Sequence, residues 1–212
     1  AETATINGKL YIGGNSIYDA QYSITTVKGS VIDSGANAEF KTTCSGTCND
    51  IIFDEGSFYY HLRNGGVLPK AVYHRLSTVE VGGVTTTAPT HISGQTYGNF
   101  TWNCPNQSTG IVMASAMDTL MNNFTIQNTG TYAIRFGGTN NEIRVMGNFV
   151  QNAGTYQVIT SNRLRVFGNA YFNNGVVDFT SNSGVHVYKN FSQGSGHLFT
   201  RSSSSVYVQF QF

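Results

Sequence analysis

Charged residues are scarce in this chain. Among 212 residues there are 12 Lys and Arg and 11 Asp and Glu, which gives a net charge of +1. This balance creates no strong field toward nucleic acid or an anionic membrane, so we expect neither as a partner. The sequence also lacks an apolar run of about 18 residues, so no membrane insertion is predicted. Its first residues lack the basic and apolar regions of a signal peptide.

Helix-forming residues are scarce as well. Ala, Leu, Glu and Lys, which favour helices, are few, whereas β-branched and aromatic residues are common. Gly, Thr, Asn and Ser number 24, 24, 21 and 19. The 14 Phe and 12 Tyr nevertheless supply more apolar surface than a disordered chain carries. The composition therefore predicts ordered β-structure with almost no helix, in a single domain over residues 1–212.

A repeat occupies the C-terminal half, and its period of about 21 residues is typical of stacked repeat architectures. It begins at Ile143, starts again at Leu164 and Val185, and enters a partial copy at Val206, while a looser copy starts upstream at Asp118. Apolar residues alternate within each copy, as in a strand with one buried face. Stacked coils, one per repeat, would bury these faces. We predict an all-β, right-handed parallel β-helix (β-solenoid) with about 21 residues per coil in this half.

Residues 1–117 repeat less regularly than residues 118–212, and we expect them to form coils of unequal length. Short strands are expected at residues 9–12, 22–27, 51–53, 57–62 and 78–81. Residues 83–96, which are weakly hydrophobic, are expected to form a loop that leaves the stack. The last copy stops partway through a coil, so we expect the chain to continue in a longer natural protein.

Asn and Gly recur at fixed places in the repeat. The Asn column contains Asn123, Asn148, Asn169 and Asn190, and the Gly column contains Gly154, Gly175 and Gly196. Both residue types adopt positive φ at low cost, so we expect them at stacked corners of the coils. Asn amides at such corners can hydrogen-bond from coil to coil, which favours a structural ladder over a ligand-binding role.

A second column contains Arg144, Arg165, His186 and Tyr207, which alternate with apolar positions and are therefore expected to face outward. A solvated edge is the simpler explanation for these four residues. The alternative is a glycan-binding or protein-binding surface, because aromatic faces stack on sugars and Arg supplies planar donors.

The cysteines suggest an oxidising environment. Cys44 and Cys48 enclose three residues that include Gly46, which allows a small disulfide, and Cys104 is left over. His residues show no zinc-ligand spacing relative to these cysteines. We predict no metal site, and the absence of a phosphate-binding loop or nucleophile elbow indicates no cofactor.

Two distinctive segments carry a family resemblance. They are YHLRNGGVLP at residues 60–69 and YGNFTWNCPNQ at residues 97–107, followed by MNNFTIQNTG at residues 121–130. From Ile51 onward the chain resembles repetitive secreted cell-surface proteins of Bacteroidota. The resemblance implies a large β-solenoid-rich protein, exported by the type IX secretion system, that serves surface attachment, in some cases as an adhesin of gliding cells. Neither a signal peptide nor a C-terminal sorting domain of that system lies within these 212 residues.

The resemblance also makes Thr119 a candidate for O-glycosylation. The Asp118-Thr119-Leu120 sequence matches the Asp-Ser/Thr-apolar pattern used for exported proteins of Bacteroidota. Asn123 and Asn190 stand in N-glycosylation sequons, but their place in the Asn column favours the ladder.

We therefore expect a non-catalytic structural or adhesive module of a large secreted cell-surface protein, located extracellularly or at the cell surface. The sequence leaves open its glycan or protein ligand, the length of the parent protein, the oligomeric state and the role of the irregular first half. The alternative is a carbohydrate-active β-helix enzyme, a polysaccharide lyase or hydrolase. Its candidate acids, Asp54, Glu55 and Asp178, do not converge, since neighbours on a strand point to opposite faces.

Overall fold

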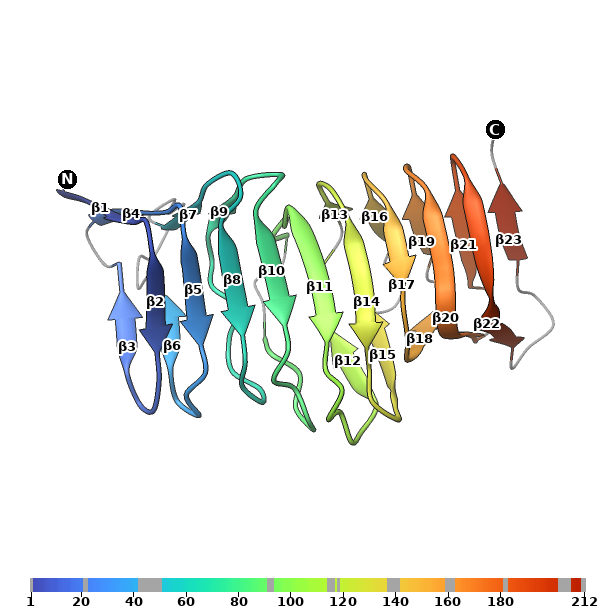
Figure 1. Ribbon diagram of the computed structural model, residues 1–212, viewed down its shortest axis with the longest axis horizontal. Coiled ribbons are helices and arrows are strands. Elements are labelled where there is room, and N and C mark those ends of the chain that lie inside the picture. Colours follow the sequence, from blue (N-terminus) through green and yellow to red (C-terminus); the bar gives the residue numbers. More distant parts are fainter. Residues whose placement is uncertain are drawn as a thin grey trace.

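The strands of the chain lie one after another along a single axis, with the two termini at opposite ends (Figure 1). The computed structural model describes residues 2–20, 23–41, 51–90, 94–113, 117, 119–136, 142–158, 163–180, 183–201 and 207–210. Every element within these ranges is a β-strand, and neighbouring strands pair in parallel. The predicted all-β parallel solenoid is therefore confirmed.

Each full coil crosses three faces in the same order. The long face contains β2 (Lys9–Ile12), β5 (Ser30–Asp33), β8 (Phe58–His61), β10 (Thr78–Val81), β11 (Asn99–Asn103), β14 (Phe124–Asn128), β17 (Phe149–Gln151), and the first parts of β20 (Ala170–Phe179) and β22 (Phe191–Arg201). The second face contains β3 (Ile17–Asp19), β6 (Glu39–Lys41), β12 (Ile111–Met113), β15 (Ala133–Phe136), β18 (Thr155–Val158) and the later parts of β20 and β22.

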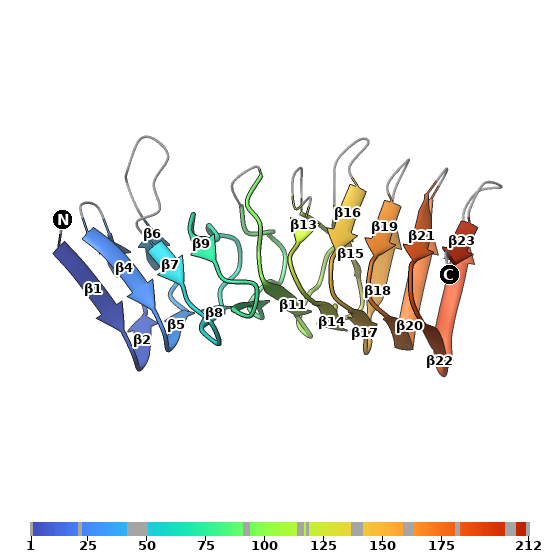
Figure 2. The ribbon, with the colours of Figure 1, turned by 90° about the horizontal axis from the view of Figure 1, so that it is seen from above.

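The third face precedes the long face in each coil, and Figure 2 shows its strands in a row along the axis. It contains β1 (Glu2–Ile6), β4 (Ser23–Val27), β7 (Ile51–Phe53), β9 (Val72–Tyr73), β13 (Thr119–Leu120), β16 (Glu142–Val145), β19 (Arg163–Val166), β21 (Gly184–Val187) and β23 (Tyr207–Phe210). Alternation of apolar residues determines which side chains enter the core. In β16, Ile143 and Val145 are buried while Glu142 and Arg144 lie on the outer surface.

On the long face, coils of the first half pair as continuously as those of the second, although their lengths differ. On the long face, Lys9 pairs with Ser30, Ser30 pairs with Phe58, and Phe58 pairs with Thr78. Of these three coils, the one from Ser30 to Phe58 is the longest. Strands expected at residues 9–12, 51–53 and 78–81 are confirmed with those bounds. The extra residues are thus accommodated between strands, which leaves the pairing of the long face intact.

The prediction that residues 83–96 leave the stack is wrong for the residues that the structure describes, 83–90 and 94–96. Thr90 forms a parallel bridge with Val67, and the Gly65 amide donates to the Thr87 carbonyl at 2.9 Å. On the other side, the Ser108 amide donates to the Thr85 carbonyl at 2.8 Å. Backbone hydrogen bonds to both neighbouring coils make this segment a corner of the solenoid, because polar side chains suit a corner as well as a loop.

Aromatic rings contact one another from coil to coil inside the solenoid. We call this series the aromatic spine, and its centroid separations are 4.8–6.2 Å. Its members are Tyr18, Phe40, Phe53, Tyr73, Tyr97, Phe100, Phe124, Phe149, Phe172 and Phe191. Aromatic pairs of this kind contribute about 0.5–1.5 kcal/mol beyond the burial of their area. The spine therefore stabilises both halves of the molecule by the same type of contact.

Candidate functional site

The asparagines of the predicted ladder bond from coil to coil. The side-chain oxygen of Asn123 accepts the backbone N–H of Asn148 at 2.9 Å, and Asn148 accepts that of Asn169 at 2.9 Å. Asn169 accepts the N–H of Asn190 at 3.2 Å. The ladder begins one coil earlier, where Asn99 accepts the Asn123 N–H at 3.3 Å. Asn99 was missed because it precedes Asp118, where the first recognised copy of the repeat starts.

The glycine column follows the prediction at two of its three members. Gly154 and Gly175 have φ of 81° and 101°, and a Cβ on Gly175 would lie 2.4 Å from the Gly154 carbonyl oxygen. For Gly196 the prediction is wrong, because this residue lies inside β22, pairs with Asn174 and does not have a positive φ. The register of β20 and β22 shifts before Asn174, so counting by the period no longer identifies the corner.

Three of the four residues predicted to share the outward column, Arg144, Arg165 and His186, pair in that order. The placement of the fourth, Tyr207, is wrong. Arg144 pairs with Arg165, and Arg165 pairs with His186. Tyr207 pairs with Gly184 instead of His186, because the last coil is longer than the period. His186 is 7% exposed, so it does not present its ring to solvent as expected. The side chain of Tyr207 lies outside the described residues.

Glu142 joins the two arginines of this column. One of its carboxylate oxygens lies 2.7 Å from Arg144 Nε, and the other lies 2.9 Å from Arg165 Nε. Thr119, the O-glycosylation candidate, is half-buried in β13 and pairs with Arg144 at the start of the column. The Glu142 carboxylate neutralises the two arginine charges that would otherwise attract a surface ligand. This favours the interpretation of the column as a solvated edge over that of a ligand-binding surface.

The structure describes one of the three cysteines considered in the sequence analysis. Cys44 and Cys48, the disulfide candidates, lie outside the described residues. Cys104 is a free thiol, fully buried, and its sulfur lies 3.3 Å from the Val81 carbonyl oxygen. Burial raises the pKa of Cys104 to about 12, so the thiol is protonated and unreactive at neutral pH.

Of the candidate catalytic acids, Asp178 lies on a distant coil, and Asp54 and Glu55 are adjacent at a corner, where the expectation of neighbours on a strand is wrong. Asp54 and Glu55 are at the corner between β7 and β8, where the Glu55 amide donates to Asp54 Oδ1 at 2.8 Å. Asp178 lies on β20, where it accepts hydrogen bonds from Gln157 at 2.5 Å and from Thr200 at 2.9 Å. None of these contacts brings two carboxylates of the candidate set together.

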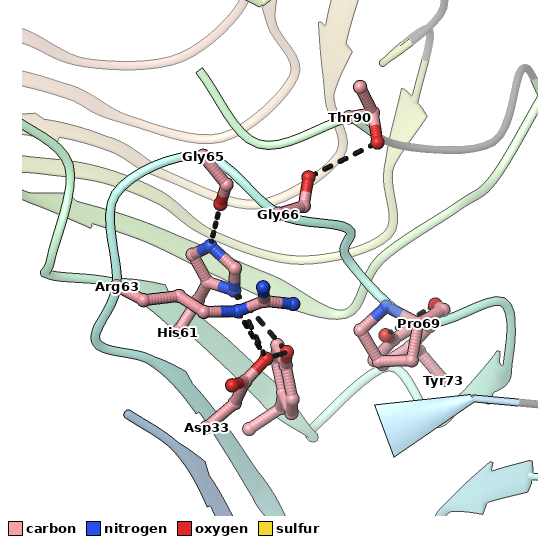
Figure 3. Close-up of polar contacts among 9 residues, drawn as sticks. Asp33, His61, Arg63, Gly65, Gly66, Pro69, Tyr73 and Thr90 are labelled. Atoms are coloured by element: carbon pink, nitrogen blue, oxygen red, sulfur yellow. Dashed lines mark hydrogen bonds and ion pairs between the residues drawn. The ribbon is translucent and has the colours of Figure 1, made fainter. Parts of the chain in front are cut away.

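A cluster of four polar side chains lies inside the N-terminal coils, and Figure 3 labels three of them, Asp33, His61 and Arg63. We call Asp33, Tyr59, His61 and Arg63 the core polar cluster; the first three are fully buried and Arg63 is 8% exposed. Asp33 Oδ2 accepts the Tyr59 hydroxyl at 2.8 Å and Arg63 Nε at 3.0 Å. His61 Nδ1 lies 3.3 Å from the Tyr59 hydroxyl.

Strand register explains how these residues meet. Asp33 ends β5 and pairs with His61 at the end of β8, in a column that continues to Ile12 on one side and Val81 on the other. Arg63 follows two residues after His61 and turns back toward Asp33 (Figure 3). Sequence reasoning missed this cluster, because Asp33 precedes Arg63 by 30 residues in the chain.

Burial controls the ionisation of the cluster. It lowers the pKa of His61 to about 4, so the imidazole is neutral at pH 7. His61 Nε2 lies 2.6 Å from the Gly65 carbonyl oxygen, and since a carbonyl only accepts, this nitrogen carries the proton. Burial also raises the pKa of Asp33, while the Tyr59 hydrogen bond and the Arg63 charge act in the opposite direction.

The loop after His61, which includes residues 64–66, covers the core polar cluster. Gly66 has φ of 80°, and a Cβ on it would lie 2.3 Å from the Arg63 guanidinium carbon. Asn64 points the other way and accepts three consecutive backbone N–H groups, those of Thr85, Thr86 and Thr87, at 2.9, 2.8 and 2.9 Å. The loop therefore covers the ion pair and fastens to the next coil, which gives the cluster a structural role.

The architecture places the chain in the class of parallel β-solenoids with a closed, side-chain-filled interior. No family model, no curated protein and no solved structure matches it. In the part of the chain that the structure describes, no three His, Cys, Asp or Glu side chains gather as metal ligands. Within the same residues, no helix has the length and apolar character needed to cross a membrane.

Proposed function

We propose that this chain is a non-catalytic β-solenoid module of a large secreted bacterial cell-surface protein, where it serves as a stalk and displays a binding surface. One observation carries the proposal: parallel coil-to-coil pairing extends along the whole long face from β2 to β22. Such stacks gain stability from each neighbouring coil, which suits an elongated rod.

The use of polar groups supports the same proposal. The ladder asparagines bond to the next coil, the Arg144 and Arg165 side chains share Glu142, and the core polar cluster is closed off from solvent. These groups link coils to one another. A catalytic pair needs exposed acid and base groups around a substrate, an arrangement that these contacts do not form.

Location and export rest on the resemblance to secreted cell-surface proteins of Bacteroidota. On that basis we place the module outside the cell and assign its export to the type IX secretion machinery. Its partner in this proposal is a surface glycan or protein that meets the outer face of the coils.

The experiment that tests the proposal maps the parent protein in its source cells. Intact mass and peptide mapping of the secreted and surface-shaved fractions, with attention to the Thr119 peptide, should place this segment within a much longer exported chain. Recovery of the segment only from the cytoplasm would contradict the proposal. Cleavage of a polysaccharide by the purified chain would contradict its non-catalytic part.

A further inference from the structure

A shallow groove of about 640 Å³ lies on the outer surface of the long face, across β2, β5 and β8. We call it the N-terminal groove. Its apolar floor consists of Ile32, Phe58, Tyr60 and Leu62, whose strand neighbours Val31 and Tyr59 point into the core. The volume falls within the range of about 300–1,000 Å³ that is usual for ligand sites.

Three glycines explain why this part of the face is hollow. Gly8, Gly29 and Gly56 line the groove at the corner between the third face and the long face, and they carry no side chains to fill it. A Cβ on Gly29 would lie 2.0 Å from the Gly8 carbonyl oxygen, so the close approach of these coils requires glycine. The hollow is therefore built into the backbone at this corner.

The same corner carries positive charge. Lys9 and Lys28 line the groove and are exposed, and no ion pair joins either of them to a carboxylate of the described residues. The residues that line the groove include no Asp or Glu. Glu80 follows Tyr60 in the outward column on β10, and its carboxylate accepts a hydrogen bond from Asn103 at 3.1 Å. The groove is thus cationic at its glycine corner and apolar along its floor.

Two aromatic rings of the floor lie along β8, and a third lies beyond Ile32 in the direction of stacking. The rings of Phe58 and Tyr60 are parallel within 7° and 5.7 Å apart. Tyr11, 65% exposed, pairs with Ile32, which in turn pairs with Tyr60, so a third ring lies in the same outward column. Aromatic ring faces carry partial negative charge and suit the C–H faces of sugar rings.

The backbone under the groove argues against a peptide occupant. β5 pairs with β2 and β8, and β8 pairs with β5 and β10, so the strands under the apolar floor have no free edge to which an extended peptide can add; among the groove strands described, β2 alone has an unpaired edge, on the side away from that floor. A polysaccharide needs no such edge. We propose that the N-terminal groove binds a uronic acid chain, with sugar rings on Phe58 and Tyr60 and carboxylates at Lys9 and Lys28.

This inference rests on the proposed function, because it names the ligand of the displayed surface. The test uses a tetramer of galacturonic acid and its methyl ester, which keeps the rings and removes the charge. In calorimetry with the whole chain, the acid should bind at least about tenfold more tightly than the ester, since two charge-assisted contacts are lost. Its affinity should also fall as salt is raised.

Two variants locate the site. Tyr60→Ala and Lys28→Gln should each weaken binding of the tetramer by about fivefold or more, because one removes a stacking surface and the other an ammonium group. The matched controls are Tyr171→Ala, in the same outward column on β20, and Lys189→Gln, an exposed lysine after β21. Both controls should bind as the unaltered chain does, and circular dichroism melts confirm folding of all four.

Several outcomes would overturn the inference. These are no binding of the tetramer, equal binding of acid and ester, an equal loss in groove and control variants, or preferential binding of poly-glutamate. Each leaves the proposed function standing, because the mapping of the parent protein is independent of the ligand. Cleavage of the tetramer on binding would contradict the non-catalytic proposal and leave the groove assignment intact.

Discussion

The two halves of the solenoid share the strand pairing of the long face and have different interiors. From β14 to β22 the coils repeat their side chains, with an Asn ladder at one corner and a core in which Phe and Val predominate around the uncharged pair Gln151 and His197. From β2 to β10 the coils contain the core polar cluster, and the N-terminal groove lies on their outer surface. The comparison shows that a solenoid tolerates sequence irregularity where strand register is kept.

The halves also differ in how their stability arises. In the C-terminal coils, apolar contacts and ladder hydrogen bonds stabilise each interface directly. In the N-terminal coils, the Asp33–Arg63 pair must first compensate the desolvation of two charges, which costs several kcal/mol per ion. We therefore expect substitutions in the two halves to change stability in different ways.

Removal of one ring from the spine should have the largest effect. Phe149 is fully buried and contacts Phe124, Phe172 and Tyr156 at 5.2–6.0 Å. Phe149→Ala should lower the free energy of unfolding by about 3–5 kcal/mol, because it leaves a cavity in a core that cannot collapse. Thermal denaturation followed by circular dichroism measures the loss, which corresponds to roughly 10 °C in Tm.

Amide hydrogen exchange locates the coils that lose stability in Phe149→Ala. Because each coil contacts only its neighbours, faster exchange after Phe149→Ala should be confined to the coils on either side. Val150→Ala on the outer surface of the same strand is the control and should change Tm by less than a quarter as much. Uniform acceleration over β2 to β10 would contradict the independence of the two halves.

Breaking the ion pair should have the next largest effect, in the other half. Arg63→Leu leaves the Asp33 carboxylate buried without its cation, at a cost of about 3 kcal/mol. The cost lies at the low end for buried pairs because burial already raises the pKa of Asp33 and allows it to take up a proton. Urea denaturation at pH 7 measures the change.

Replacing the whole cluster gives the opposite result and sharpens the comparison. Asp33→Val, Tyr59→Phe, His61→Val and Arg63→Leu together restore the apolar column found at Ile12 and Val81. The combined variant should approach or match the unaltered chain in stability, because no buried charge or hydroxyl is left unpaired and the remaining cost is the Gly65 carbonyl, which loses its hydrogen bond from His61. A combined variant less stable than Arg63→Leu alone would show that the cluster contributes net stability.

These two regions also differ in what the sequence could predict. The columns of the second half repeat at 21 residues, so the solenoid and the positions of Asn148, Asn169 and Asn190 followed from counting. The core polar cluster did not, because the long coil from Ser30 to Phe58 hides the pairing of Asp33 with His61.

Counting also failed where coil length changed. Gly196 and Tyr207 lie where the coil is longer than the period, and Asn99 precedes the first recognised copy of the repeat. Counting alone identifies side chains that share a column only while the number of residues per coil is constant; Asn123, 25 residues before Asn148, was found because the residues around it match the later copies. The N-terminal groove was not predicted for a different reason. Its glycines and lysines belong to corners of different coils and become neighbours only when the coils stack.

Acid should destabilise the N-terminal half through His61. The pKa of this residue is about 4 in the folded chain and about 6.5 when unfolded, so between these values the unfolded state binds the extra proton. Stability should therefore fall as pH decreases from 6.5 to 4, by up to about 3 kcal/mol. The raised pKa of Asp33 has the opposite sign: its contribution is present at low pH, is lost as pH rises through that pKa, and partly offsets the loss.

The variant His61→Gln isolates this contribution. A glutamine amide can still donate to the Gly65 carbonyl but does not titrate, so the Tm of the variant should change less between pH 7 and about 4.5. Burial also lowers the pKa values of His186 and His197, which form a common background in both proteins. His74→Gln, outside the cluster, is the control, and an unchanged acid slope in His61→Gln would contradict the assignment.

The smallest effect should come from the ladder, and it tests whether the second half depends on its regularity. Asn169→Ala removes the oxygen that accepts both the backbone and the side-chain N–H of Asn190, while the backbone N–H of residue 169 still donates to Asn148. One corner hydrogen bond is worth about 0.5–1.5 kcal/mol, so Tm should fall by roughly 2–4 °C. Asn173→Ala, which loses an exposed side-chain bond to Asn152, is the control. An equal loss in both variants would mean that the ladder contributes no more than any surface amide, and that backbone pairing and the aromatic spine hold these coils in register.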